Sequence, residues 1–162
     1  MIYQIHSYRI TQNKIIKSKN LNDLIIYSDN DAGHILYENL GGWKEYKEAM
    51  TKYTDSISEN YYTMDNVTTA NTMNDVVTYL YDHKEDYKGL IKNMEKAEPG
   101  EYLDRDTQLS MPQKYGMYDY ALNSVGFVEC NTSYSIVVLT SLGDKGADVM
   151  ANINRIAYEH FK

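Results

Sequence analysis

The sequence predicts an α/β protein of the α+β type, with helices before about residue 100 and strands after it. Apolar residues recur at helical spacing up to that point, whereas short apolar runs of strand length follow it. The composition, 43% hydrophobic and 24% charged, is that of a folded chain. Its 162 residues suit one domain. We expect a helical lobe over about residues 11–100, and a sheet with a terminal helix over about residues 101–162.

The first two predicted helices are short and adjacent. Residues 21–27 form an apolar helix, and Ser28 is then placed to cap a second helix, because a serine hydroxyl at that position accepts a backbone N–H. Gly41 and Gly42 end the second helix, since glycine adopts the left-handed conformation at low cost. The positions expected to face inward on this helix are Ala32, Ile35, Leu36 and Leu40.

Three further helices are predicted before residue 100. Residues 43–53 form an amphipathic helix, and the polar residues 54–68 form a loop, of a length that is more often functional than accidental. Helix resumes near Ala70, and another follows over about residues 87–94. The apolar stripes of these helices are Trp43, Tyr46, Ala49, Met50 and Tyr53; Met73, Val76, Val77 and Leu80; and Tyr87, Leu90, Ile91 and Met94.

Three strands and a helix are predicted after residue 100. Residues 113–118 form a strand, preceded by a proline that a strand tolerates at its entry. Residues 125–130 and 134–140 form two more strands, whose short connection predicts an antiparallel hairpin. Glycines at 143 and 146 break the chain before a last helix that lies across the sheet. Its predicted apolar face is Met150, Ile153, Ala157 and Phe161.

Charge and composition exclude several function classes. The formal charge of −7 and the absence of a Lys/Arg cluster argue against a nucleic-acid partner. The single cysteine, Cys130, excludes an intramolecular disulfide and is expected to be a buried, inert thiol. The four histidines have no metal-ligand spacing, and we predict neither a metal nor a cofactor. Residues 1–10 do not resemble a signal peptide, so localisation stays open.

Several short motifs occur in a distinctive order. Ser28-Asp29-Asn30 stands at the start of a helix that ends in Gly41-Gly42, residues 66–70 read Asn-Val-Thr-Thr-Ala, and Lys114-Tyr115-Gly116 opens a strand. Alone, a serine followed by an aspartate is also a good helix cap. Together, these segments resemble the C-terminal part of the class A β-lactamases and penicillin-binding proteins, with their Ser-Asp-Asn and Lys-Thr-Gly motifs.

The resemblance implies roles for the residues around the first motif. Ser28 would shuttle a proton towards the leaving nitrogen of the substrate, and Asn30 would hydrogen-bond the amide arm of the substrate. Asp29 would mostly fix the turn. The substrate would be a β-lactam or a peptidoglycan-like peptide, and the sequence does not decide between them.

The second motif would form one wall of the same site. Lys114 would supply positive potential for the substrate carboxylate, although a lysine alone at such a position is typical of a solvated strand edge. Gly116 would let the backbone approach the substrate, with an oxyanion-hole N–H near Met117 or Tyr118. Tyr115 replaces the family's threonine or serine, and its larger phenol directs the oxygen elsewhere.

Two family elements are missing from the sequence. The loop of residues 58–66 lacks the family's Glu-x-x-Leu-Asn pattern, and Glu59 and Asp65 are the only candidate replacements for its glutamate. None of the ten serines has a lysine three positions later, as the nucleophile motif requires. Thr11 and Lys14 have that spacing but lie too close to Ser28.

The resemblance therefore implies a partial β-lactamase/transpeptidase-like fold: a helical lobe, a three-stranded antiparallel remnant of the sheet, and a C-terminal helix packed on it. The apolar strand of residues 134–140 would be an exposed edge that forms a homodimer, pairs with an N-terminal segment, or belongs to a longer enzyme. Three functions stay open: a β-lactam- or D-Ala-D-Ala-peptide-directed serine hydrolase that is inactive as this chain, a non-catalytic relic or binding domain, and an unrelated α/β protein.

Overall fold

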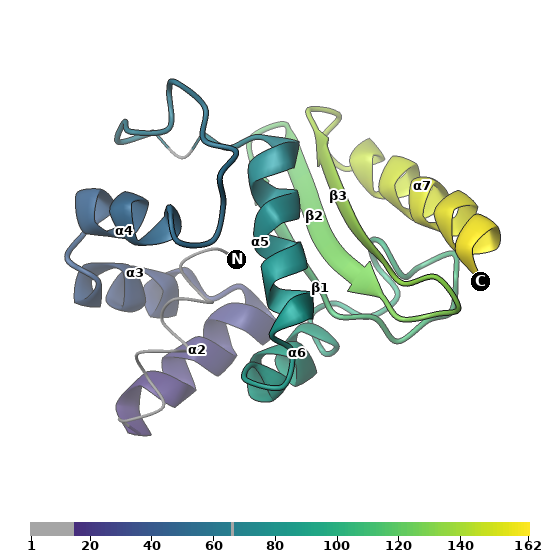
Figure 1. The fold of residues 1–162 in the computed structure, drawn as a ribbon, viewed down its shortest axis with the longest axis horizontal. Coiled ribbons are helices and arrows are strands. Elements are labelled where there is room, and N and C mark those ends of the chain that lie inside the picture. The colour runs from purple at the N-terminus through teal and green to yellow at the C-terminus, as the bar shows by residue number, and fades with distance from the viewer. Residues whose placement is uncertain (1–14, 66) are drawn as a thin grey trace. The chain divides into compact units, whose positions relative to one another are not determined.

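The computed structural model describes residues 15–65 and 67–162, and the chain divides between Leu90 and Ile91 into two compact units. These described residues contain six helices and a three-stranded antiparallel sheet (Figure 1). The predicted α+β class is confirmed, because the helices α2–α6 come before the strands and α7 follows them. No helix among the described residues has the length and apolar character that a membrane span requires.

The first unit is helical. It contains α2 (Ile15–Tyr27), which packs against α3 (Asn30–Asn39), followed by α4 (Trp43–Met50) and α5 (Ala70–Asp82). Helix α6 (Lys88–Met94) spans the division between the units. The buried apolar side chains of this unit come from every one of these elements and from the connecting turns, and they include Leu24, Ile25, Leu36, Met50, Tyr53, Val76, Val77, Leu80 and Tyr87.

The N-terminus of α3 corrects the predicted cap. Asp29, not Ser28, is the capping residue, and its Oδ1 accepts a 2.8 Å hydrogen bond from the backbone N–H of Ala32. Ser28 instead has a φ of +54°, a left-handed conformation that non-glycine residues adopt infrequently. The predicted helix end is as expected, since Gly41 and Gly42 have φ values of +102° and +88°.

We predict that Asp29→Ala lowers the stability of the first unit by about 1 kcal/mol, the usual loss when a capping side chain is removed. Ser28→Ala should not produce this loss, because the serine does not cap the helix. Urea denaturation followed by far-UV circular dichroism measures both variants. Equal losses in the two variants would contradict the assignment of the cap.

The loop between α4 and α5 is attached to the start of α5. Asp75 accepts hydrogen bonds from Thr54 Oγ1 (2.8 Å) and from the backbone N–H of Ser56 (3.2 Å), and these bonds lower the pKa of Asp75. The Thr72 hydroxyl also donates to the carbonyl of Ser56. Helix α4 ends at Met50, three residues earlier than predicted, but Tyr53 is still buried, with its ring 4.9 Å from that of Tyr79.

The second unit contains the sheet, in the order β1 (Gln113–Tyr118), β2 (Ala121–Val128) and β3 (Tyr134–Thr140), with both pairs antiparallel. Strand β2 begins four residues before the predicted position, because Asp119 and Tyr120 turn the chain directly back onto β1. β1 pairs along its whole length, from Gln113 opposite Gly126 to Tyr118 opposite Ala121.

Helix α7 (Lys145–Phe161) packs against β2 and β3. The core between them is a single apolar cluster, and its buried members are Leu103, Met111, Leu122, Val128, Ile136, Val138 and Met150. The predicted face of α7 is partly wrong. Ile153 is exposed, and the buried residues are Gly146, Met150, Ala151 and Asn154. Cys130, expected to be buried, is half-buried, and its thiol donates to the carbonyl of Thr132.

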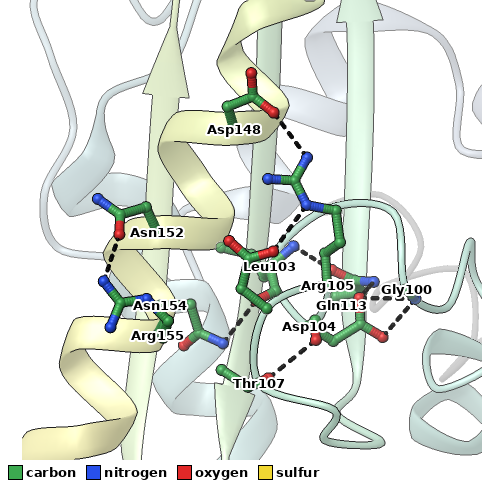
Figure 2. A network of polar contacts seen from close by, with 11 residues as sticks. Gly100, Leu103, Asp104, Arg105, Thr107, Gln113, Asp148, Asn152, Asn154 and Arg155 are labelled. Atoms are coloured by element: carbon green, nitrogen blue, oxygen red, sulfur yellow. Dashed lines mark hydrogen bonds and ion pairs between the residues drawn. The ribbon is translucent and has the colours of Figure 1, made fainter.

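Buried polar side chains join α7 to the segment that leads into β1 (Figure 2). Gln113 accepts a hydrogen bond from the backbone N–H of Leu103 (2.9 Å) and donates to Asp104 (2.8 Å). Asn154 donates to the Leu103 carbonyl (2.8 Å) and accepts from the hydroxyl of Tyr134 (2.9 Å). Because both backbone groups of Leu103 are bonded to buried amides, this network fixes the segment before the strand.

Candidate functional site

The structure places the first motif at the entrance to α3. The backbone of Ser28 is left-handed, the side chain of Asp29 caps the helix, and Asn30 is the first helical residue. Ser28 is half-buried, whereas Asp29 and Asn30 are exposed. Ser28 shares this left-handed backbone with three other non-glycine residues of the described part of the chain, Glu98, Gln108 and Asp119.

A pocket of about 310 Å³ lies next to this motif, within the first unit. Asn30 lines it from α3, and Met64 and Asp65 line it from the loop before α5. Of the two predicted loop acids, Asp65 therefore shares the pocket with Asn30, and Glu59 is not among the lining residues. The remaining large side chains around the pocket come from α3 and α4, and they are His34, Tyr37, Trp43, Tyr46 and Lys47.

Lys47 is the residue of this pocket that the sequence analysis missed. Its side chain is only 3% exposed, its Nζ donates a 3.1 Å hydrogen bond to the backbone carbonyl of Asp65, and it lies 4.4 Å from the ring centroid of Tyr61. Burial lowers its pKa, an effect that the nearby Asp65 partly opposes. The signal in the sequence was its position one helical turn after Trp43, on the same face of α4.

The second motif lies on β1, in the second unit. Antiparallel register places Lys114 opposite Val125 and Gly116 opposite Asn123 on one face of the sheet. Tyr115, opposite Ser124, lies on the other face, which packs on α7. The end of the strand is open to solvent, with Gly116, Met117 and Tyr118 all exposed.

Lys114 is not the solvated strand-edge lysine that its residue type alone suggests. It is 5% exposed, and its Nζ lies 4.2 Å from the ring centroid of Tyr115. Burial lowers the pKa of Lys114 to about 8, against a smaller upward effect of the carboxylate of Glu98. A lysine with a pKa of about 8 loses its proton at a much lower pH than a surface lysine does.

This pKa predicts a pH-dependent stability. Between about pH 8 and 10.5, the unfolded chain holds the Lys114 proton and the folded chain releases it, so folding becomes more favourable as the pH rises. The free energy of unfolding of the natural chain, minus that of Lys114→Met, should rise by up to about 1.4 kcal/mol per pH unit in this window and stay constant below it. Urea denaturation of both chains at several pH values measures the difference. A difference that does not change with pH would contradict the assigned pKa.

Tyr115 packs within the second unit, and its ring also lies beside the Nζ of Lys114. Its ring stacks on that of Tyr102, with centroids 4.5 Å apart and planes at 21°, and both rings pack against the apolar cluster under α7. The Tyr115 ring therefore takes part in the packing of the second unit.

The predicted site residues thus form two groups, one in each unit. Ser28, Asp29, Asn30 and Asp65 belong to the first unit, whereas residues 114–118 belong to the second. Within the described residues, no group of three or more His, Cys, Asp or Glu side chains is arranged to hold a metal ion.

Comparison with known proteins identifies the family. The family model described as the β-lactamase enzyme family matches residues 8–161. The chain belongs to this family. No curated protein matches it.

Solved structures share the β-lactamase fold. The TLA-3 extended-spectrum β-lactamase is 20% identical, with a TM-score of 0.73 over 88% of this chain and 63% of its own. A class A β-lactamase from Bacteroides cellulosilyticus is 21% identical, with a TM-score of 0.70 over 87% of this chain and 62% of its own. PBP-A is 14% identical, with a TM-score of 0.72 over 90% of this chain and 61% of its own. The β-lactamase-like fold is therefore present in part, and the chain spans less than two thirds of each of these proteins.

Proposed function

We propose that this β-lactamase-family chain carries part of a site for acyl transfer from β-lactams or D-Ala-D-Ala peptides. The observation that supports it most is the Ser28-Asp29-Asn30 turn, in which a left-handed serine directly precedes a helix capped by the aspartate. In this arrangement the Asp29 side chain caps the helix, and Asn30 lines the adjacent pocket. A variant of PBP-A has been solved as an acyl-enzyme with penicillin G, and we assign the same substrate class to this chain.

We assign to Lys114 and Gly116, in the second unit, the roles that the family's second motif implies. A buried ammonium is a strong attractor for a carboxylate, because little water competes for it. The exposed backbone after Lys114 would supply an oxyanion-hole N–H at Met117 or Tyr118. The open space beside Gly116 supports its role. A Cβ built at Gly116 meets no atom within 4 Å, so a ligand has room to approach the strand there.

We infer that this chain alone does not form an acyl-enzyme. Acylation needs a nucleophile activated by a nearby base, and none of the ten serines is followed by a lysine at the required spacing. Neither of the candidate loop acids, Glu59 and Asp65, stands in the pattern by which the family activates the deacylating water. The alternative is a non-catalytic binding domain, which the pocket beside Asn30 favours because it is formed by this chain itself.

Incubation with a slowly released penicillin, followed by intact-mass spectrometry, tests the proposal. We expect an unchanged mass together with shifts in the amide NMR signals of residues around Asn30 and Lys114. A covalent mass increase that is lost when the chain is denatured beforehand would show a complete nucleophilic site and overturn the inference of inactivity. An unchanged mass with no NMR shifts in a folded chain would overturn the proposed substrate class.

We also propose that the chain forms a homodimer through β3. This strand lies at the edge of the described sheet and carries no charge, proline or glycine to prevent pairing. In an antiparallel pair of β3 strands with a two-fold axis at Val137, Val137 would lie opposite Val137 of the second copy and Ser135 opposite its Leu139, so no two charges would meet. Sedimentation should show a dimer that Val137→Lys converts to a monomer. A natural chain that is monomeric at high concentration would contradict this proposal.

A further inference from the structure

The pocket of the first unit has features that acyl transfer does not use. Of its lining residues, the acyl-transfer proposal uses only Asn30. Part of the remaining lining is an aromatic wall from α3 and α4, in which Tyr37 and Tyr46 meet with ring centroids 5.7 Å apart and Trp43 also lines the pocket. A volume of about 310 Å³, with three aromatic rings and several charged or hydrogen-bonding side chains in its lining, is within the range of sites for small organic ligands.

One of the two charged side chains that line this pocket, Lys47, is a buried cation. An ammonium has three N–H donors, and Lys47 uses one of them on the carbonyl of Asp65, while the ring of Tyr61 covers one side of the group. Neither contact is a carboxylate hydrogen bond. The Tyr61 ring is itself buried, so little water reaches this side of Lys47. A buried cation in this state is stabilised by an incoming anion.

The other polar groups around the pocket are compatible with an anion. His34 lines it from α3 and, like Asn30, can donate a hydrogen bond. The carboxylate of Asp65 is the only negative charge among the lining residues, and Asp65 is exposed, so solvent screens its charge more than that of Lys47. A ligand with a carboxylate and an aromatic ring could bind the Lys47 ammonium and the aromatic wall at the same time.

We propose that this pocket binds a small aromatic carboxylate, with the carboxylate on Lys47 and the ring beside Trp43, Tyr37 and Tyr46. The site is contained in the first unit and depends on neither the nucleophile nor the second motif. Experiments can therefore support or contradict this proposal independently of the acyl-transfer proposal.

Fluorescence provides a direct test, because Trp43 is the only tryptophan in the chain. Three probes share one ring and differ in charge: phenylacetate, phenylacetamide and phenethylamine. We expect phenylacetate to change the emission of the full chain saturably, with an affinity at least tenfold higher than that of the neutral or the cationic probe. Equal affinities, a preference for the amine, or no saturable change with phenylacetate would overturn the proposal.

Two lysine variants locate the anion. Lys47→Met should abolish the preference for phenylacetate over phenylacetamide, while circular dichroism verifies that the helices are retained. Lys44→Met is the matched control, since Lys44 is exposed and also lies near Trp43, with its Nζ 5.4 Å from the ring centroid, but does not line the pocket. A preference that survives Lys47→Met, or is lost in Lys44→Met, would show that the anion binds elsewhere. If Lys47→Met unfolds the chain, Lys47→Arg must retain the preference, and its loss there would count against the proposal.

Discussion

Gly126→Ala is expected to destabilise the second unit by about 1–3 kcal/mol, the usual cost of forcing a methyl group into a packed core. A Cβ at Gly126 would lie 2.5 Å from the carbonyl oxygen of Pro112 and 2.9 Å from Met111 Cε. The oxygen belongs to the backbone of the segment that enters β1, so it cannot rotate away as a side chain does. The two paired strands would have to separate at this point.

Gly116→Ala is the matched control, in the strand that pairs with β2. A Cβ at Gly116 meets nothing within 4 Å, and the loss of glycine's conformational freedom should make the variant equally stable or more stable by up to about 1 kcal/mol. Urea denaturation of both variants measures the difference. A Gly126→Ala chain as stable as Gly116→Ala would contradict the close approach of Pro112. Because Gly116→Ala should keep the fold, a loss of ligand-induced NMR shifts in that variant would report on the proposed site alone.

Asn154→Leu should lower stability by about 2–5 kcal/mol, although leucine is more apolar and has a similarly branched side chain. The substitution removes the donor to the Leu103 carbonyl (2.8 Å) and the acceptor for the Tyr134 hydroxyl (2.9 Å). The carbonyl has no water to replace the lost bond, since Leu103 and Asn154 are fully buried. The unsatisfied buried polar group lowers the free energy of unfolding by more than the apolar contacts of leucine raise it.

The matched control for this change is Asn152→Leu, two residues earlier on α7. Asn152 is exposed and bonds to the guanidinium of Arg155, so its replacement should change stability by no more than about 0.5 kcal/mol. Adding Tyr134→Phe to Asn154→Leu should cost less than Tyr134→Phe alone, because the two side chains share one hydrogen bond. Additive effects in thermal or urea denaturation would show that this bond does not contribute to stability.

The fold class and the element order could be predicted because they depend on local patterns. Helical periodicity before residue 100, the Gly41-Gly42 stop and the hairpin before Tyr134 are all properties of neighbouring residues. The motif order also predicted the family, which the family model confirms over residues 8–161. The errors lie where a distant contact decides between two locally similar residues.

Three such errors concern burial and capping. Ser28 and Asp29 are both good capping residues, and the left-handed backbone at Ser28 gives the cap to Asp29. On α7, the apolar Ile153 is exposed and the polar Asn154 is buried, because Leu103 and Tyr134 supply hydrogen-bond partners for the amide. Lys114 is expected at the surface from its residue type, but it is buried in the strand position opposite Val125.

The sequence by itself determined the class, the order of the elements and the family, since each depends on residue types and their spacing along the chain. Only the tertiary structure decided which polar groups are buried and which residues share a pocket. Lys47 and Asp65 are eighteen positions apart, and no local pattern connects them. Their contact exists because the loop folds back onto α4, where the desolvation of an ammonium is offset by a carbonyl and an aromatic ring far away in the sequence.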